Sequence, residues 1–147
     1  LGAANYFTYA FASRDGKNPS KDILVKADTA FASLAKLAPD YEVAYLFRAR
    51  IGKNLDDAEN SKKLAVPYYE KYIELITAKP EKAAASKTQL IEAYNYLGAV
   101  AAVTDKEKAK EYFNKVLAID PQNALALDNL KFLTAPATPV KKTPIKK

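Results

Sequence analysis

Residues 112–130 read YFNKVLAIDPQNALALDNL, which is two stretches of good helix formers separated once by Asp-Pro. The same arrangement occurs upstream in FASLAKLAPDYEVAYL at residues 31–46, and a weaker version occurs in EKYIELITAKPEKAAA at residues 70–85. A proline inside a helical pattern ends the helix near the preceding residue, so each of these sites joins two helices. We therefore expect them to be the joints of a helical repeat.

The three joints are evenly spaced, because Pro39, Pro80 and Pro121 lie 41 residues apart. The residues before each proline also match. Eight residues before it is an aromatic (Phe31, Tyr72 and Phe113), and five residues before it is an aliphatic (Leu34, Leu75 and Val116). Twelve residues before it are Ala27, Tyr68 and Ala109. Spacings of three and four residues place such side chains on one face of a helix. A helical period of 20 to 50 residues indicates a solenoid of helix pairs.

Composition favours one all-α domain. The chain has 147 residues, 49% of them apolar, with only four glycines and few segments that alternate like strands. We expect helices at residues 2–13, 19–37, 41–52, 64–79, 87–103, 105–119 and 122–133.

Capping signals refine these boundaries. Thr104 and Glu107 form a predicted capping box for the helix at 105–119. Asp120 is expected to cap the next helix, with Pro121 at its first position. Ser86 and Gln89 offer another box, although a continuous helix from residue 81 is the alternative.

The absence of cysteine and histidine excludes disulfides, the usual zinc and iron sites, and Cys-His or Ser-His-Asp catalysis. Without a glycine-rich phosphate loop either, we expect no enzyme, no cofactor and no metal site. Asp56, Asp57 and Glu59 resemble calcium ligands, but they lack the glycine and the spacing of a calcium loop, which favours a solvated turn. No apolar run approaches the roughly 20 residues that span a bilayer.

Charge does not indicate a nucleic-acid partner. The net charge is +6, but Lys141, Lys142, Lys146 and Lys147 supply +4 of it, which leaves +2 for residues 1–133. Residues 134–147 contain three prolines, four lysines and no acidic residue, so we expect a disordered tail. Such a tail serves as a linker or, alternatively, as a tether to an anionic surface.

The ends of the chain suggest processing. Because it opens on Leu1 and contains no methionine, we expect a processed product or a piece of a longer protein, with any targeting sequence upstream. Absence of cysteine suits export without demanding it, so we favour an extracytoplasmic, periplasmic location over the cytoplasm.

Residues 92–123, EAYNYLGAVAAVTDKEKAKEYFNKVLAIDPQN, closely resemble a tetratricopeptide (TPR) repeat. The residues that carry the resemblance are Tyr94, Leu97, Gly98, Ala109, Phe113, Val116 and Pro121. Residues 19–39 match the family's second helix, whereas residues 42–80 match more loosely and have Gly52 where an aromatic is usual. The 41-residue interval also suits a HEAT-type repeat, which is the alternative.

The resemblance implies about three repeats, at residues 3–39, 42–80 and 87–121, and a capping helix at 122–133 that covers the last apolar face. Small residues at Gly98 and Ala109 would let two helices approach closely. The expected packing residues are Ala27, Phe31, Tyr45, Tyr72, Tyr94, Leu97, Gly98, Ala109, Phe113 and Pro121. A tyrosine cluster at Tyr68, Tyr69 and Tyr72 is read as core rather than as a stacking platform.

TPR proteins are mainly scaffolds, so the resemblance implies a peptide or protein partner on the concave face formed by the first helix of each pair. The expected contact residues are Phe7, Phe11, Val43, Leu46, Arg50, Glu92, Asn95 and Ala99, with Leu46, Arg50 and Asn95 acting together. Alternatively, Phe7 and Phe11 pack against upstream repeats. A second alternative is a structural segment that self-associates and binds no separate ligand.

One TPR subgroup grips the C-terminal carboxylate of chaperones with lysines, asparagines and an arginine. The corresponding positions here are Phe7, Phe11, Phe47, Glu92 and Tyr96, none of which is basic or an amide. That specific function is therefore not expected.

Overall fold

The computed structural model describes residues 1–135 of the chain. Within that range the backbone forms α-helices and no strand. The helices are α1 (Gly2–Arg14), α2 (Asp22–Leu37), α3 (Glu42–Leu55), α4 (Val66–Thr77), α5 (Pro80–Ala85), α6 (Lys87–Ala101), α7 (Lys106–Ile119) and α8 (Ala124–Thr134). The predicted all-α fold is confirmed, and the predicted tail lies, from residue 136 onward, outside the described residues.

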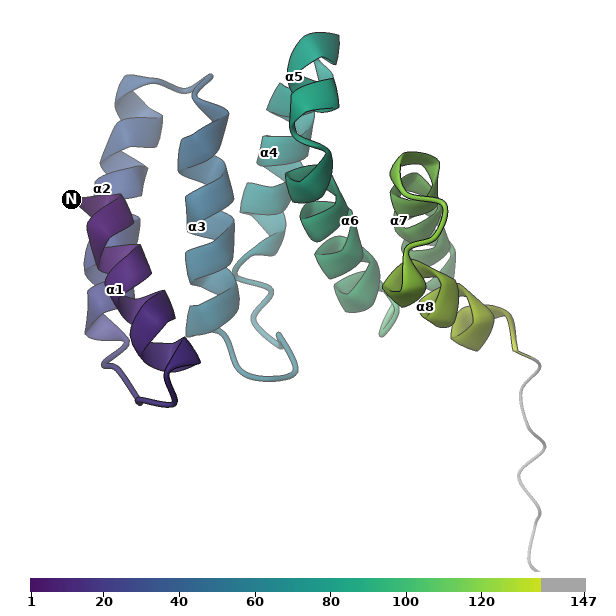
Figure 1. Cartoon of the computed structure of the whole chain (residues 1–147), viewed down its shortest axis with the longest axis horizontal. Helices are drawn as coiled ribbons and strands as arrows, with labels where there is room; N and C mark the ends of the chain where they lie inside the picture. Colours follow the sequence, from purple (N-terminus) through teal and green to yellow (C-terminus); the bar gives the residue numbers. More distant parts are fainter. Residues whose placement is uncertain (136–147) are drawn as a thin grey trace, which may run out of the picture.

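The helices follow one another in chain order along the long axis of the molecule (Figure 1). α1 packs on α2, α2 on α3, α3 on α4, α6 on α7 and α7 on α8. α6 lies in front of α4, and α8 lies in front of α7, so the array has two layers (Figure 1). This arrangement is the array of helix pairs that the sequence predicts.

The turn between α7 and α8 differs from the prediction. Asp120 does not cap α8 but follows α7 as an extended residue, with φ −134° and ψ 91°. The N-cap is Asn123, whose Oδ1 accepts a hydrogen bond from the Ala126 amide at 3.2 Å. Asn123 Nδ2 in turn donates to Asp120 Oδ2 at 3.1 Å. Asp120 therefore orients the capping residue, and Pro121 lies in the turn rather than at the first helical position.

The start of α7 is also displaced by one residue from the prediction. Asp105 has an extended backbone, and its Oδ1 accepts a hydrogen bond from the Lys108 amide at 3.0 Å. Asp105 is thus the N-cap, because its carboxylate reaches one of the free amide groups of the first turn. The predicted box of Thr104 and Glu107 is wrong.

A short extra helix, α5, precedes α6. Pro80 stands in its first turn, where the missing N–H removes no helical hydrogen bond. Ser86 separates α5 from α6, and its side chain makes no capping hydrogen bond. Neither the predicted box of Ser86 with Gln89 nor the continuous helix is therefore present.

The core has two parts. One part lies between the first three helices and contains Tyr9, Leu24, Ala27, Phe31, Ala35, Ala44 and Ile51. The other extends from α3 to α8 and is centred on Tyr69, Tyr72, Ile76, Leu97, Phe113 and Val116, among others. Tyr45 is partly buried and packs against both parts, so α3 joins them.

Most of the residues expected to pack the repeats are buried. They are Ala27, Phe31, Tyr72, Tyr94, Leu97, Gly98, Ala109 and Phe113, whereas Tyr45 is partly buried and Pro121 is exposed. Gly98 is covered by the ring of Phe113, because a Cβ at Gly98 would lie 2.8 Å from two ring atoms. The sequence predicts that Ala109 packs against Gly98, but the ring of Phe113, one helical turn later on α7, fills the space next to Gly98.

Gly52 allows the long connection after α3 to fold back onto that helix. A Cβ at Gly52 would lie 2.9 Å from the carbonyl carbon and oxygen of Leu64 and 3.0 Å from the nitrogen of Ala65. Asn60 and Lys63 adopt left-handed backbone conformations within the connection, with φ 53° and 54°. The aromatic side chain that is usual at this position would overlap the backbone of Leu64 and Ala65, so only a glycine fits here.

Asp56 organises the same connection. Its carboxylate is buried and accepts hydrogen bonds from the amides of Asp57, Lys62 and Leu64 at 2.9, 3.2 and 3.0 Å. Burial raises the pKa of Asp56, but these amide bonds outweigh it and hold the pKa below the usual value. Residues 1–135 contain no group of three or more potential ligands that could hold a metal ion. The Asp56 carboxylate instead binds backbone amides of its own loop.

None of the helices in residues 1–135 combines the length and the apolar character needed to cross a membrane.

Candidate partner-binding groove

A groove of about 330 Å³ opens between the first helices of the pairs. Its walls come from α1, α3, α4 and α6, which are far apart in the sequence. The lining residues are Tyr6, Arg50, Lys53, Asn54, Tyr69 and Glu92. Helix α3 contributes three of them, because positions 50, 53 and 54 share one face of a helix.

An ion pair between Arg50 and Glu92 lies in the lining of the groove. Arg50 Nε donates to Glu92 Oε1 at 2.9 Å, and Arg50 Nη2 donates to Glu92 Oε2 at 2.6 Å. The Tyr69 hydroxyl, which comes from the buried side of α4, donates to Glu92 Oε1 at 2.8 Å. This two-point geometry fixes the orientation of both side chains.

The same contacts determine how Glu92 and Tyr69 ionise. Burial raises the pKa of Glu92, but hydrogen bonds from Arg50 and Tyr69 outweigh it and hold the pKa below the usual 4.5. Burial and the neighbouring Glu92 carboxylate raise the pKa of Tyr69 well above its usual value. At neutral pH, Glu92 is therefore an anion and Tyr69 is a neutral donor.

An aromatic cluster adjoins the groove on α1 and α3. Tyr6 meets Phe47 edge to face at 5.2 Å between ring centroids, and Phe7 meets Phe47 in the same way at 5.9 Å. Phe31 stacks on Phe47 at 4.7 Å and supports it from the core. Phe7 and Phe11 stack on each other at 5.8 Å, yet they stay 42% and 52% exposed. Apolar rings thus remain accessible beside the groove.

The structure brings together only some of the predicted contact residues. Arg50 and Glu92 line the groove, and Phe7 and Phe11 lie in the adjoining cluster. Leu46 is only 7% exposed and packs in the larger core, so it is not available as a surface anchor. The reason is that α3 packs on α2 on one side and on α4 on the other.

The remaining predicted contacts lie outside the groove lining. Asn95 Nδ2 is directed at Asn123 Oδ1, 3.5 Å away, at the start of α8. Ala99 is exposed on α6, and Val43 is partly buried on α3. The predicted trio of Leu46, Arg50 and Asn95 is therefore not assembled.

Four lining residues were missed by sequence reasoning: Tyr6, Lys53, Asn54 and Tyr69. The spacing of Arg50, Lys53 and Asn54 indicates that all three lie on one face of a helix, which predicts that Lys53 and Asn54 accompany Arg50. The sequence pattern predicts a core position for Tyr69, and the residue is fully buried, but its hydroxyl reaches Glu92 in the groove.

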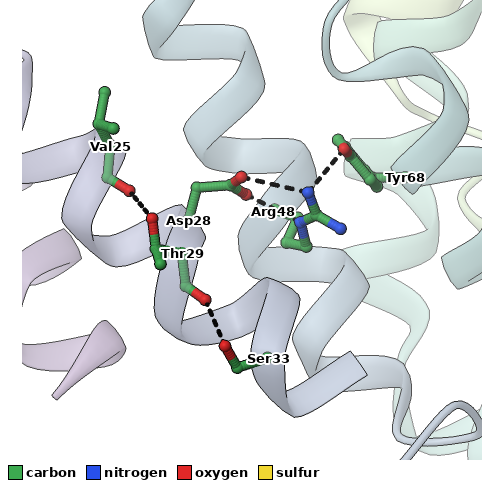
Figure 2. Close-up of polar contacts among 6 residues, drawn as sticks. All are labelled: Val25, Asp28, Thr29, Ser33, Arg48 and Tyr68. Atoms are coloured by element: carbon green, nitrogen blue, oxygen red, sulfur yellow. Dashed lines mark hydrogen bonds and ion pairs between the residues drawn. The ribbon is translucent and has the colours of Figure 1, made fainter. Parts of the chain in front are cut away.

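A second arginine of α3 makes a separate polar network with α2 and α4 (Figure 2). Arg48 Nε and Nη2 donate to the two carboxylate oxygens of Asp28 at 2.8 and 3.1 Å. Arg48 Nη2 also donates to the Tyr68 hydroxyl at 2.8 Å, and the guanidinium lies 4.2 Å from the Tyr68 ring centroid. Tyr68 therefore links neighbouring helices, while Tyr69 and Tyr72 are buried, so the three tyrosines do not form a stacking platform.

Known proteins share this architecture. A tetratricopeptide repeat family model matches residues 103–123, which contain α7 and the turn at Asp120. The crystal structure of the C-terminal part of a TPR repeat-containing protein from Cytophaga hutchinsonii matches 89% of this chain at 32% identity, with a TM-score of 0.70. The chain belongs to the tetratricopeptide repeat family. No curated protein matches the sequence.

This chain spans about half the length of the matched protein, because the match covers 47% of that protein's chain. α1 packs on α2, α3 on α4 and α6 on α7, which gives three consecutive helix pairs. We take α1, α3 and α6 as the first helices of these pairs. The structural match favours the TPR assignment over the HEAT alternative. TPR repeats generally mediate protein–protein interactions and are generally non-catalytic modules.

Proposed function

We propose that this TPR array is a non-catalytic scaffold that binds a peptide or a protein segment in the groove between α1, α3 and α6. The observation that carries the proposal is the composition of the groove. Three consecutive first helices contribute to one groove of about 330 Å³, and exposed Phe7 and Phe11 adjoin it.

The chemistry of the groove suits recognition better than catalysis. The sequence contains neither histidine nor cysteine, and the Glu92 carboxylate in the groove is neutralised by Arg50. Interfaces commonly combine a few exposed aromatic anchors with charged groups that set orientation. The accessible rings and the fixed ion pair supply both kinds of group.

Photo-crosslinking of a purified partner complex tests the proposal. A photoreactive amino acid in place of Asn54, which lines the groove, should attach to the partner. The same amino acid in place of Thr29, which is exposed on α2, serves as the control and should not. Attachment from Thr29 alone would place the partner on another face and contradict the proposal.

Self-association is the second candidate function, because α8 leaves an apolar stripe exposed. Leu125 is 57% exposed and Phe132, two turns later on the same helix, is 78% exposed. A capping helix is expected to carry a polar outer face. Light scattering of the purified domain tests this candidate: a concentration-dependent dimer that Phe132→Ser abolishes would support it, and a stable monomer would contradict it.

A further inference from the structure

We propose that the groove selects a peptide with a carboxylate side chain, held by the side chains of Tyr6, Arg50 and Lys53. The inference rests on the proposed function, since it names the ligand class of the same groove. It follows from the hydrogen-bond donors that the groove leaves unused.

Arg50 has only part of its donor capacity occupied. A guanidinium carries five N–H groups, and Arg50 uses Nε and Nη2 for Glu92. Its other nitrogen, Nη1, makes no hydrogen bond with residues 1–135. The ion pair with Glu92 thus holds the guanidinium in place while leaving one edge available for a second acceptor.

Lys53 and Tyr6 add further donors to the same groove. The ammonium of Lys53 is exposed and forms no ion pair or hydrogen bond within the described residues. The hydroxyl of Tyr6 likewise makes no hydrogen bond there, and burial raises its pKa, so it stays protonated at neutral pH. Both groups line the groove with Arg50 and can donate to an anion.

The charge balance of the lining favours an anion. Arg50 and Lys53 supply two positive charges, and Glu92 supplies one negative charge that is already paired with Arg50. An incoming carboxylate would meet a net charge of +1 and three kinds of unused donor. An incoming lysine or arginine would meet the same net positive charge, and the acceptors left in the lining are one site on the already paired Glu92 carboxylate and the neutral amide oxygen of Asn54.

The neighbouring rings define the rest of the ligand. Phe7 and Phe11 lie on the same helix as Tyr6 and remain about half exposed. Tyr6 contacts Phe7 at 5.4 Å between ring centroids, so a peptide whose carboxylate is held at Tyr6 would place an adjacent side chain near these rings, where an aromatic or aliphatic group is favoured. The expected ligand combines an apolar residue with a neighbouring acidic residue.

Matched synthetic peptides test the inference by NMR titration of the whole chain. The probes are acetyl-Phe-Glu-Glu-Leu-amide and its twin, acetyl-Phe-Gln-Gln-Leu-amide. We expect the glutamate peptide to shift the backbone amides of Tyr6, Phe7 and Lys53, and to bind at least about fivefold more tightly than its twin. Lys53→Gln should reduce this preference to less than about twofold, whereas Lys115→Gln on α7 should leave it unchanged.

The outcomes separate the two proposals. If the glutamine peptide shifts the groove amides with equal affinity, or if Lys53→Gln keeps the preference, the groove binds peptides but the anion inference is wrong. If neither peptide shifts the groove amides, both the inference and the proposed peptide groove are contradicted. Because Lys53 is exposed and unpaired within the described residues, its substitution should leave the fold intact, which a circular dichroism spectrum checks.

Discussion

Arg50 on α3 and Glu92 on α6 form a two-point ion pair, although 42 residues separate them. The two side chains are 26% and 31% exposed, so the pair is neither fully buried nor free in solvent. Because Tyr69 also donates to Glu92, the pair connects α3, α4 and α6, which belong to two successive helix pairs. Both side chains line the groove, and the pair also links neighbouring helices of the array.

Breaking this link should destabilise the fold moderately. Glu92→Gln leaves Arg50 without its carboxylate, and we expect a loss of about 1 to 2 kcal/mol, between the values typical of exposed and of buried pairs. Urea unfolding measures the loss. The matched control is Glu74→Gln, which breaks an exposed pair with Lys71 within α4 and should cost less. If Glu92→Gln and Glu74→Gln lower the free energy of unfolding equally, the Arg50–Glu92 pair adds no stability by linking helices.

The contribution of Glu92 should depend on pH in a defined direction. Its pKa in the folded chain lies below the usual 4.5, so the ionised form stabilises the fold above that pH. The stabilisation is lost as the pH falls through the folded-state pKa. The difference in unfolding free energy between the parent chain and Glu92→Gln should therefore be largest near neutral pH and shrink at acid pH. A difference that grows on acidification would contradict the assignment.

Gly98 should tolerate no side chain without cost. Alanine is the better helix former by about 1 kcal/mol, but its Cβ would lie 2.8 Å from the buried Phe113 ring. We expect Gly98→Ala to be destabilising despite its propensity, and Gly98→Leu to cost about 1 to 3 kcal/mol more. Ala99→Leu, at the exposed neighbouring position, is the control and should be nearly neutral. If leucine is no worse than alanine at position 98, α6 and α7 do not meet there.

Asp56 should be essential to the connection between α3 and α4. Asp56→Ala removes the acceptor of three amides, which would leave the loop backbone without its partners. We expect faster hydrogen exchange at the amides of Lys62 and Leu64 and a lower Tm. Glu59→Ala, an exposed change in the same loop, should alter neither. Unchanged exchange at both amides in Asp56→Ala would show that the carboxylate does not hold the loop.

Local features of the fold were visible in the sequence. Proline breaks with apolar residues at helical spacing predicted the helices other than the short α5, and Leu97 with Gly98 predicted a close helix contact. The capping residues were less certain, because Thr104 and Asp105 are both good caps and only the backbone conformation decides between them. The structure of the long connection after α3 could not be predicted either, because Asp56 binds amides up to eight residues away in the sequence.

The groove was only partly predictable for a different reason. Arg50 and Glu92 were expected on first helices, but their pairing depends on the angle between repeats, which no local pattern encodes. Leu46 was expected to be exposed, yet neighbouring helices on both sides of α3 leave only a narrow accessible face. Tyr69 shows the same difficulty, because one side chain both fills the core and reaches the groove.

The most direct measurement compares the affinity of a purified partner for two double variants of the array. One variant, Phe7→Ser with Phe11→Ser, removes the exposed rings beside the groove, and the other, Leu125→Ser with Phe132→Ser, removes the exposed stripe on α8. If the partner occupies the groove, the first variant should bind roughly thirtyfold more weakly, as expected for the loss of anchors worth about 2 kcal/mol, while the second binds like the parent chain. Full affinity in the first variant together with lost affinity in the second would show that the partner binds α8 and not the groove.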